Sequence, residues 1–568
     1  MPQAVTIASP GLQALILCGP GSSFPTFTAN PDEKPKALIP LGNRPMVWYP
    51  LDFCYRAGIT DITLVCPPSA AAAIDTALKT NPFLTSLPFP RPDLLAPKQL
   101  DLNTGTAQIL ALPEIQTLVK SDFLVLPCDL VCELEAHKLL QAWMVKAVSL
   151  PDLLNDTHTS HSLRSGGLGV WYDTRTLPIK GEETDFLGTV PLESTTARPP
   201  TGSLFPHLSK VVYSTPTDSL NDLLDKKNGL PVRRSLVRHH PAVRMRTTLR
   251  DAHLYIFPRW VMNLARDNDQ FEAIGEDIVG WWAKAGWQDG LAQKLNLDKL
   301  VELDDPKDRK QQQQHEDKSR PSTATSSPTK AGATTPQQPG ASPFAANGTS
   351  APPPEEPTRP RVPPMIAYVP PPPPTTADTT SPAPIIRRVD TAQLLAHTNQ
   401  ELAKHRSADT SRLEGVAPSI YAHARKVAYP EGVHARAHVS EADSLLADNV
   451  TVQQRASVKA SVVGANCRIL EGAKLAQCTL FEGVVVGKNC KLTRCILGDN
   501  SEIGDGCVLT DCEVQHNMLV EPKTEAKGER FMSSSGLEAT EEDMAAFDND
   551  DSENNDSGDG GKEDGDDE

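Results

Sequence analysis

The sequence predicts an α/β domain followed by a parallel solenoid, and three observations support this fold class. Short apolar runs that suit buried strands alternate with helical segments near the N-terminus. A strict 17-residue repeat of aliphatic residues occupies the last quarter of the chain. A stretch rich in Pro, Ser, Thr and Gln separates the two regions. With 568 residues, the chain is long enough for two or more domains.

The N-terminal region shows the alternation most clearly. The apolar runs LQALILC (12–18), DITLVCP (61–67) and DFLVLPCD (122–129) read as buried strands, and PMVWYPLDFCYRAGI (45–59) reads as an interrupted helix that ends near Gly58. This order predicts a parallel sheet with helices on both faces. In such sheets the ligand binds beyond the carboxyl ends of the strands, which is where a glycine-containing loop and Asp129 fall.

The middle of the chain changes composition sharply. Residues 306–362 contain almost no large apolar side chain, so they cannot bury enough area to offset the entropy of ordering, and they are predicted to be a disordered insertion. The run MIAYV from residue 365 again reads as a strand. Residues 390–405 read as a helix with Asp390 as N-cap and Gln393 three residues later. The apolar face of this helix is formed by Leu394, Leu395, Thr398 and Leu402.

The strongest internal signal lies in three consecutive blocks of 17 residues between 462 and 512. Within each block the apolar steps are 6, 6 and 5 residues, as a triangular solenoid requires, although an ideal coil has about 18 residues. Each buried aliphatic side chain stabilises the fold by roughly 1.5–3 kcal/mol. The three ladders are Val463, Leu480, Leu497 and Val514; Ile469, Val486 and Ile503; and Leu475, Leu492 and Leu509.

Cysteines follow the same repeat. Cys478, Cys495 and Cys512 are 17 residues apart, as are Cys490 and Cys507. A zinc site needs paired ligands two to four residues apart, which this spacing does not supply. Stacked, reduced core cysteines are therefore the preferred interpretation, with a metal site or a disulfide as the alternative.

Composition and charge restrict the class of protein. No run of about 18 apolar residues is present, and the N-terminus lacks the pattern of a secretion signal, so no membrane partner is expected and a reducing cytosol is the default location. The net charge is −17, but the stretch from Leu537 to Glu568 alone holds 15 acidic residues and one lysine. The rest of the chain is near neutral, which argues against broad nucleic-acid binding and against direct binding of DNA.

The acidic tail and a basic stretch each allow two interpretations. The tail is either a solvated disordered segment or an acidic contact arm with Met544 and Phe547 as apolar anchors. The basic stretch at 226–250 is either a charged surface or a contact for an acidic partner or RNA. No aromatic residues separate its arginines, so a stacking platform for single-stranded RNA is not expected. Its basic residues are Lys226, Lys227, Arg233, Arg234, Arg238, His239, His240, Arg244, Arg246 and Arg250.

The plan of this chain resembles that of sugar-phosphate nucleotidyltransferases such as GDP-mannose pyrophosphorylase, and of the gamma and epsilon subunits of eukaryotic translation initiation factor 2B. The resemblance implies a Rossmann-like nucleotidyltransferase domain followed by a left-handed β-helix of the hexapeptide-repeat type. The segments that favour the gamma subunit are KPKALIPLGNRPMVWYPLDFCYRAGI, FLVLPCDLV, LVRHHPAVRMRTTLRDAHLYIFPRWVM and IIRRVDTAQLLAHTNQEL. Only a short polar and acidic stretch follows the last coil, so the helical repeat domain of the epsilon subunit is not expected here.

The resemblance also indicates which residues would line a nucleotide pocket. Gly19 and Gly21 match the loop that wraps a triphosphate, but Pro20 lacks an N–H group, and Ser23 stands where active enzymes carry an arginine. Loss of one stabilising donor costs about 10²–10³ in rate. Gly105 and Thr106 match the lining of the nucleotide pocket. Lys36 matches the lysine of the family, and Asp129 matches its metal-binding aspartate.

The loop therefore has three interpretations. It is a vestigial turn, a pocket that binds a nucleotide or sugar nucleotide without turnover, or the site of an active transferase. Because Ser23 carries no charge, no catalytic residue, metal site or cofactor is assigned. Asp129 alone does not support an enzyme, since an aspartate at a strand end is as often a helix cap.

The predicted organisation follows from these patterns. The expected function, implied by resemblance, is that of a non-catalytic subunit of the guanine-nucleotide exchange factor for translation initiation factor 2. Its expected partners are the epsilon, alpha, beta and delta subunits and the substrate GTPase. The alternative is an active sugar-phosphate nucleotidyltransferase. The domains expected are 1–305 nucleotidyltransferase-like, 306–362 disordered, 363–410 the end of the first domain with the connecting helix, 411–525 β-helix, and 526–568 disordered acidic tail.

Overall fold

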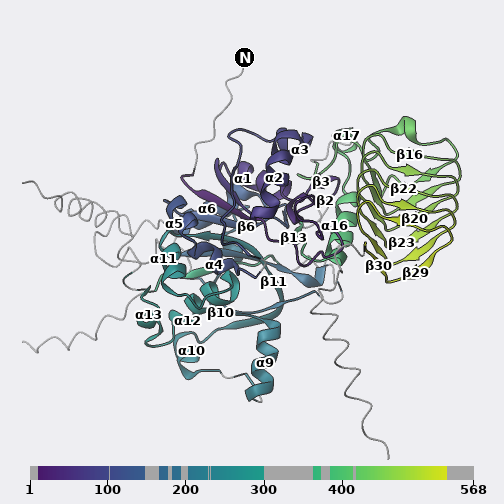
Figure 1. Ribbon diagram of the computed structural model, residues 1–568. Coiled ribbons are helices and arrows are strands. Elements are labelled where there is room, and N and C mark those ends of the chain that lie inside the picture. Colours follow the sequence, from purple (N-terminus) through teal and green to yellow (C-terminus); the bar gives the residue numbers. More distant parts are fainter. Residues whose placement is uncertain are drawn as a thin grey trace, which may run out of the picture. The chain divides into compact units, whose positions relative to one another are not determined.

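A computed structural model gives the architecture of the chain (Figure 1). It describes residues 10–101, 103–147, 166–176, 179, 182–192, 202–227, 229–230, 232–297, 299, 362–371, 384–413 and 418–533. Of the insertion predicted at 306–362, residues 306–361 lie outside these described residues, as do the acidic residues beyond 533. Within the described part, no helix is both long and apolar enough to cross a membrane.

The chain forms two compact units, which do not follow the domain boundaries predicted from the sequence. The first unit consists of Met1–Gly19, Val47–Ala71 and Leu84–Arg388. The second consists of Pro20–Met46, Ala72–Phe83 and Val389–Glu568. The division therefore runs through the glycine loop. Residues 20–46 pack with the C-terminal solenoid, although the sequence assigned them to the N-terminal domain.

The first unit is built on a nine-stranded sheet with the strand order β5-β4-β1-β6-β11-β8-β12-β10-β9. The three buried strands predicted from the N-terminal apolar runs are present as β1, β4 and β6, and the strand predicted at 365 is β12. The strands of this sheet are β1 (Gln13–Leu17), β4 (Asp61–Val65), β5 (Asp93–Leu95), β6 (Phe123–Pro127), β8 (Gly167–Asp173), β9 (Asp185–Pro191), β10 (Leu208–Pro216), β11 (Arg244–Phe257) and β12 (Met365–Tyr368).

Only part of this sheet is parallel. β1 pairs in parallel with β4 and β6, and β4 with β5. β11 instead runs antiparallel to both β6 and β8, and β10 runs antiparallel to β9 and β12. The parallel sheet predicted from the N-terminal strands is present in β1, β4 and β6, and the antiparallel pairs were not predicted. Antiparallel neighbours such as β9 and β10 need no crossover helix, so strand–helix alternation does not mark them.

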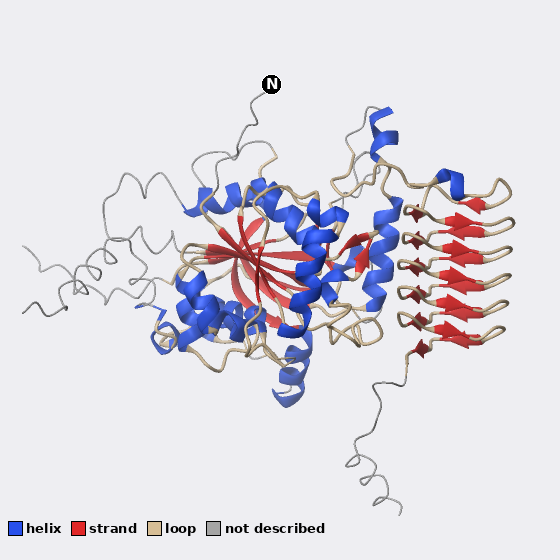
Figure 2. Cartoon of the chain, turned by 45° about the horizontal axis from the view of Figure 1, so that its top comes forward, coloured by secondary structure: helices blue, strands red, loops and turns tan. Residues whose placement is uncertain are grey.

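Helices lie around the sheet of the first unit in both ribbon views (Figures 1 and 2). The helix predicted to end near Gly58 is α1, which ends at Arg56. A core that includes Trp171, Trp260 and Trp282 is almost fully buried.

The α-helices of both units are, in chain order, α1 (Trp48–Arg56), α2 (Pro68–Thr80), α3 (Pro82–Thr85), α4 (Thr106–Ala111), α5 (Pro113–Leu118), α6 (Ala136–Ala147), α9 (Thr217–Lys227), α10 (Arg234–His239), α11 (Trp260–Asp267), α12 (Gly280–Ala285), α13 (Leu291–Lys294), α16 (Ala392–Lys404) and α17 (Ala408–Leu413). The last two, α16 and α17, belong to the second unit.

The second unit contains the solenoid, in which three parallel sheets form the sides of each coil. Figure 2 shows its regular stack of short strands. The first sheet is β14 (His438–Val439), β17 (Ser457–Lys459), β20 (Lys474–Ala476), β23 (Lys491–Thr493), β26 (Val508–Thr510) and β29 (Glu525–Lys527). The second is β15 (Leu445–Leu446), β18 (Val462–Val463), β21 (Thr479–Leu480), β24 (Ile496–Leu497), β27 (Glu513–Val514) and β30 (Arg530–Phe531). The third is β16 (Thr451–Val452), β19 (Arg468–Ile469), β22 (Val485–Val486), β25 (Glu502–Ile503) and β28 (Leu519–Val520).

The predicted ladders are the interior of this solenoid. Leu480 pairs with Leu497, Val486 with Ile503 and Leu475 with Leu492, each 17 residues apart and each buried. The first coil is longer, because His438 pairs with Ser457. The last strand ends at Phe531, beyond the predicted domain end at 525.

The cysteine ladder is also confirmed as part of the core. Cys478, Cys495 and Cys512 are buried and free, as are Cys490 and Cys507. Burial raises the pKa of the Cys467 thiol to about 12, so this side chain stays a neutral thiol at physiological pH. Among the described residues, no group of three or more His, Cys, Asp or Glu side chains is placed to hold a metal ion.

The connecting helix differs from its prediction at one point. α16 begins at Ala392, and its N-cap is Thr391, whose side-chain oxygen accepts from the N–H of Leu394 at 3.2 Å. Asp390, the predicted cap, lies one residue too early because the first turn starts later than the sequence pattern suggested. The predicted apolar face, which includes Leu395 and Leu402, is buried.

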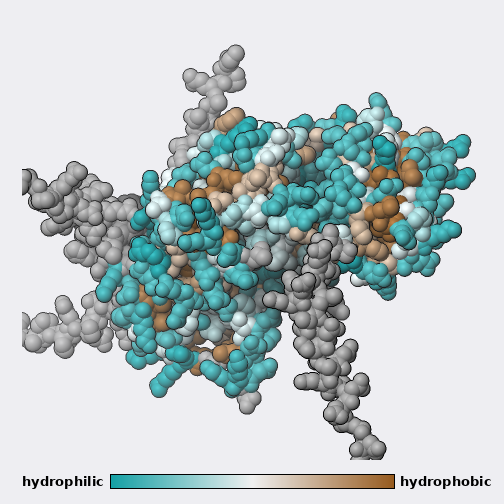
Figure 3. Space-filling model, viewed as in Figure 1, coloured by the Kyte–Doolittle hydropathy of each residue, from teal (hydrophilic) through white to brown (hydrophobic). Residues whose placement is uncertain are grey.

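The surface seen in Figure 3 is largely hydrophilic, with apolar residues gathered in separate patches. In the solenoid this follows from the strand alternation. Leu492 points inward and is 1% exposed, while its neighbours Lys491 and Thr493 point away from the core.

Replacement of Leu480 and Leu497 by aspartate should unfold the solenoid. Two carboxylates would then face the same buried ladder, where neither finds a partner, at a cost of several kcal/mol each. Hydrogen exchange followed by mass spectrometry should show loss of protection throughout residues 438–531. Thr493→Asp, which points outward, is the matched control and should keep protection. Retained protection in the double variant would contradict the assignment of the ladder to the core.

Candidate functional site

The glycine loop follows strand β1, and three amide groups in its second half are bound inside the loop itself. The N–H of Phe24 donates to the carbonyl of Gly21 at 2.8 Å, and the N–H groups of Phe27 and Thr28 donate to the carbonyl of Phe24 at 2.9 Å. The Thr28 hydroxyl donates to the Gly21 carbonyl at 2.7 Å. A loop that cradles phosphate directs such N–H groups outward, whereas here they close a compact turn.

The two loop glycines have different roles. Gly21 has a φ of +88°, and a Cβ there would lie 2.8 Å from Cγ2 of Thr28, so the turn requires glycine. Gly19 has no positive φ, and a Cβ there would meet nothing within 4 Å. Ser23 is exposed at the surface. The position that should carry the stabilising arginine therefore carries a small neutral side chain.

The lysines behind the loop are engaged by other groups. Lys36 is 9% exposed, and its ammonium lies 5.7 Å from the centroid of the Phe24 ring. Lys34 forms an ion pair with Asp499 at 2.6 Å, on a turn of the solenoid. A cation–π contact to Phe24 contributes about 0.5–2 kcal/mol. Each lysine thus stabilises the packing of residues 20–46 within the second unit.

Several further contacts hold residues 20–46 against the solenoid inside the second unit. The rings of Phe27 and Phe481 lie 5.3 Å apart between centroids. The Thr26 hydroxyl donates to Glu513 at 2.6 Å, and the Asn43 side-chain amide donates to a solenoid carbonyl, that of Val463, at 3.1 Å. The connecting helix takes part through Asn399, which accepts from the N–H of Gly42 at 2.6 Å. The segment that the resemblance assigns to nucleotide binding is anchored to the solenoid at both ends.

The other predicted pocket residues belong to the first unit. Gly105 is the N-cap of α4, and a Cβ there would collide with the backbone carbonyl of Glu272. The Thr106 hydroxyl accepts from the N–H of Ile274 at 3.0 Å, and the N–H of Ala107 donates to the Glu272 carbonyl at 2.8 Å. This glycine is needed for close packing of two backbone segments, and the donors of the segment are already bound.

Asp129 lies at the expected place, just beyond the carboxyl end of β6 and near the end of the parallel neighbour β1. It is 1% exposed and is followed by the short strand β7 (Leu130–Cys132), so it does not cap a helix. β13 (Ile386–Arg388) pairs antiparallel with β7 and brings the Arg388 guanidinium to 3.7 Å from Asp129. An arginine thus supplies positive charge beside the aspartate that matched a metal ligand.

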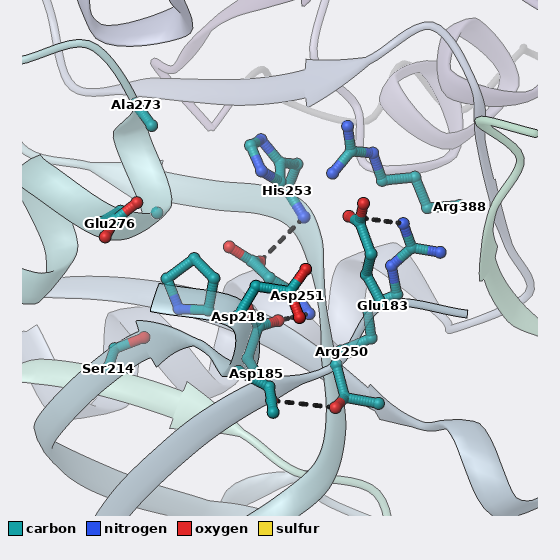
Figure 4. Close-up of a pocket in the computed structure, with 14 residues that line it drawn as sticks. Glu183, Asp185, Ser214, Asp218, Arg250, Asp251, His253, Ala273, Glu276 and Arg388 are labelled. Carbon is teal, nitrogen blue, oxygen red and sulfur yellow. Dashed lines mark hydrogen bonds and ion pairs between the residues drawn. The ribbon is translucent and has the colours of Figure 1, made fainter. Parts of the chain in front are cut away.

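A second polar site, which the sequence did not predict, lies where β9, β10 and β11 meet in the first unit. It is a cavity of about 150 Å³, and both acidic and basic side chains converge on it (Figure 4). Figure 4 shows Asp185 and Asp251 close together and the Arg250 guanidinium beside the Glu183 carboxylate, to which it forms an ion pair at 3.8 Å. The hydroxyls of its lining can add hydrogen bonds to a small polar molecule. The polar lining residues are Glu183, Thr184, Asp185, Ser214, Thr217, Asp218, Arg250, Asp251, His253, Glu276 and Arg388.

The centre of this cavity depends on an irregularity in β11. Its pairing with β8 shifts register between Asp251 and Tyr255, and His253 has a φ of +53°. The bulge lets the Tyr255 hydroxyl and the N–H of His253 both donate to the Asp251 carboxylate. The N–H of Asp251 donates to Asp185 at 2.6 Å. A charged residue inside the apolar run LRDAHLYIF was the one signal in the sequence that marked this position.

The surroundings of Asp185 and Asp251 raise the pKa of both carboxyl groups. Burial raises the pKa of Asp251, and the nearby charge of Asp185 raises it further. Burial likewise raises the pKa of Asp185 to about 6, while the N–H of Asp251 and the charge of Arg250 oppose this increase. One of the pair therefore tends to carry a proton near neutral pH.

The basic stretch at 226–250 divides between surface and core. Arg234 and Arg238 lie on α10 and Arg244 on β11, and all three are exposed. Arg250 is not part of this surface, because it is buried and its guanidinium lies 3.7 Å from Glu182. The prediction that treated the ten basic residues as one surface was wrong for Arg250, since this part of β11 is buried and its neighbours Leu249 and Asp251 are buried with it.

Comparison with known proteins gives matches in both parts of the chain. Residues 27–151 match the family model "Nucleotidyl transferase", and residues 426–526 match "EIF2B subunit epsilon LbH domain". The chain thus has a nucleotidyltransferase-type α/β domain, and its solenoid is a left-handed β-helix, as the sequence predicted. Thr26 lies just before the first match and Lys34 lies within it, and both contact the solenoid.

Three curated relatives match parts of the chain. The chain is 27% identical over 294 residues to "Translation initiation factor eIF2B subunit gamma" of Schizosaccharomyces pombe, which covers 51% of this chain and 55% of the relative. The subunit of the same name from Caenorhabditis elegans is 26% identical over 147 residues, covering 26% of this chain and 34% of the relative. "Translation initiation factor eIF2B subunit epsilon" of S. pombe is 29% identical over 109 residues, covering 19% of this chain and 16% of the relative.

The chain thus spans about half the length of the first of these relatives and less of the others. These matches confirm the resemblance to eIF2B gamma that was predicted from the sequence.

Gly105→Ala and Gly19→Ala form a matched test of the two glycine positions. The first substitution should destabilise the protein by about 1–3 kcal/mol, since the added methyl group meets a backbone carbonyl that cannot move freely. The second should be neutral or stabilising by up to about 1 kcal/mol, because it removes only freedom of the unfolded chain. Thermal unfolding of the two variants is the measurement. Equal destabilisation would contradict the assigned packing.

Asp185→Asn should change the pH dependence of local stability. A carboxyl whose pKa is raised on folding loses stability as pH rises from its unfolded value, about 4, through its folded value. The amide carries no such penalty, so the variant should gain roughly 1–3 kcal/mol over the wild type at pH 8 and little at pH 4. Hydrogen exchange of β11 amides measures the difference, with Asp218→Asn, at an exposed position, as the control. A constant difference at both pH values would contradict the raised pKa.

Proposed function

We propose that this chain, which resembles the gamma subunits of translation initiation factor eIF2B, is a non-catalytic subunit of a guanine-nucleotide exchange assembly for translation initiation factor 2. The observation that carries the proposal is the pairing of two matches in one chain. The α/β domain matches nucleotidyl transferases, and the β-helix matches the LbH domain of an eIF2B subunit. The relatives named as eIF2B subunits add support from the sequence.

The geometry of the glycine loop supports a non-catalytic role. Phosphoryl transfer depends on positioned N–H donors and cations around the phosphates. In this loop the N–H groups of Phe24 and Thr28 are bound internally, Lys36 faces an aromatic ring, and Ser23 has replaced the arginine. The loop has the shape of a nucleotide loop while its binding groups serve folding. Gly19, Gly21, Lys36, Gly105, Thr106 and Asp129 are then vestigial nucleotide-site residues.

In this proposal the chain promotes exchange of GDP for GTP through its partners. It would pair with an epsilon subunit that carries the catalytic residues, assemble with the alpha, beta and delta subunits, and contact the GTPase, all in the cytosol. The β-helix suits such a role, because its flat sides display rows of residues that repeat every 17 positions.

An active sugar-phosphate nucleotidyltransferase is the second candidate. The match of residues 27–151 to nucleotidyl transferases and the retention of Asp129 at the end of β6 favour it. This enzyme would convert a nucleoside triphosphate and a sugar phosphate into a sugar nucleotide and pyrophosphate. It would require donors that are free to bind phosphate, and the internal bonds of residues 21–28 oppose that requirement.

Purification of the tagged chain from its native cells, at moderate salt, tests the proposal. We expect a stoichiometric partner with the same two domains and an additional helical C-terminus, together with the GTPase. Recovery of the chain only with copies of itself would contradict the proposal and favour the enzyme.

Ser23→Arg provides the complementary test in the purified chain with GTP, mannose 1-phosphate and magnesium. If the arginine were the one missing element, turnover would rise by about 10²–10³. The proposal predicts no turnover in the variant or the wild type, because the loop N–H groups remain bound internally. Ser22→Arg, at the neighbouring exposed position, is the control. Pyrophosphate release specific to Ser23→Arg would contradict a vestigial site.

A further inference from the structure

One face of the β-helix carries three lysines that form no ion pair with a described residue. This face, called the lysine face, is the outer side of the first solenoid sheet from β17 to β29, part of which is labelled in Figure 1, and it also carries Val508 on β26 and the exposed Glu525 on β29. Lys459, Lys474 and Lys491 are exposed, and none forms an ion pair with a described residue. Lys527 lies farther along the same sheet, close enough to Asp511 to lower its pKa together with Arg494.

The register places two of these charges side by side. Lys474 pairs with Lys491 on the adjacent strand, and adjacent strands are about 4.8 Å apart. Like charges directly opposite one another are destabilising. At other positions the same 17-residue step joins opposite charges, as for Arg494 and Asp511, whose side chains are 2.7 Å apart. Lys474 and Lys491 have no such partner among the described residues.

The chain itself contains a segment of complementary charge that begins beside this face. β29 contributes Lys527 to the lysine face, and Phe531 ends the last described strand, in the same final coil. The stretch 537–568 then holds 15 acidic residues and one lysine. From the last coil to β17 the face extends across four strand spacings, roughly 20 Å. About six extended residues cover that distance, so the acidic stretch is several times longer than required.

We propose that the acidic stretch 537–568 of the same chain lies along the lysine face and neutralises it. The contact is electrostatic and has no fixed register, so it exchanges rapidly and weakens with salt, since the Debye length falls from about 10 Å at 0.1 M to about 3 Å at 1 M. The inference does not depend on the proposed function.

The reactivity of the lysines in the full chain tests this contact. An ammonium beside carboxylates has a raised pKa and reacts more slowly with an acetylating reagent. We compare the wild type with a variant in which six acidic residues become amides: Asp548→Asn, Asp550→Asn, Asp551→Asn, Glu553→Gln, Asp556→Asn and Asp559→Asn. Labelling of Lys474 and Lys491, read by mass spectrometry, should rise by about threefold, because fewer carboxylates then stabilise the unreactive charged ammonium groups. Lys98, on the other unit, is the control and should not change.

Carbodiimide cross-linking identifies the occupant directly. We expect amide links between Lys474 or Lys491 and peptides from 537–568, formed at low salt and lost in 0.5 M NaCl. In a mixture of ¹⁴N and ¹⁵N chains, the links should join peptides of the same isotope. Links between different isotopes would overturn the assignment to the same chain. Equal acetylation of wild type and variant would overturn the contact, and binding of polyuridylate to the lysine face in both would identify an external polyanion as the occupant.

Discussion

The 17-residue register of the solenoid is the constraint on which the second unit depends. It stacks Leu480 on Leu497 and Val486 on Ile503, and it places the free cysteines between them. The same register fixes residues outside the core. Asp499, on a turn, and Glu513, on β27, are held at positions where they bind Lys34 and Thr26. The core of the solenoid therefore also determines where residues 20–46 are anchored.

This anchoring explains why a loop can keep the shape of a nucleotide site without its chemistry. Gly21 is retained because of its positive φ and its closeness to Thr28, and Gly105 because of its contact with Glu272. Neither reason involves a phosphate. Packing therefore preserves the glycines, and the N–H groups of Phe24, Phe27 and Thr28 are bound inside the loop. The polar cavity at Asp185 and Asp251 is independent of this loop and lies in the first unit.

Much of the fold followed from sequence periodicity, and the site did not. Strands β1, β4 and β6, helix α16 and the solenoid ladders were predicted because their apolar spacing is regular. The antiparallel pairs of the sheet were missed, since antiparallel neighbours such as β9 and β10 need no crossover helix and leave no strand–helix alternation in the sequence. The bulge at His253 brings Asp251 beside Asp185, 66 residues away in the sequence, and no local pattern records such a pairing. The hydrogen bond between Thr26 and Glu513 joins residues 487 apart, and no local sequence pattern predicted it either.

Amide hydrogen exchange of residues 20–46, with and without GTP, mannose 1-phosphate and magnesium, tests the central claim most directly. The claim is that the loop N–H groups and lysines serve packing on the β-helix and leave no site for a triphosphate. The account predicts slow exchange at Phe24, Phe27 and Thr28 that the ligands leave unchanged. Fast exchange in the free chain that becomes slow when the ligands are added would contradict it, because the loop would then be open and would close around a nucleotide.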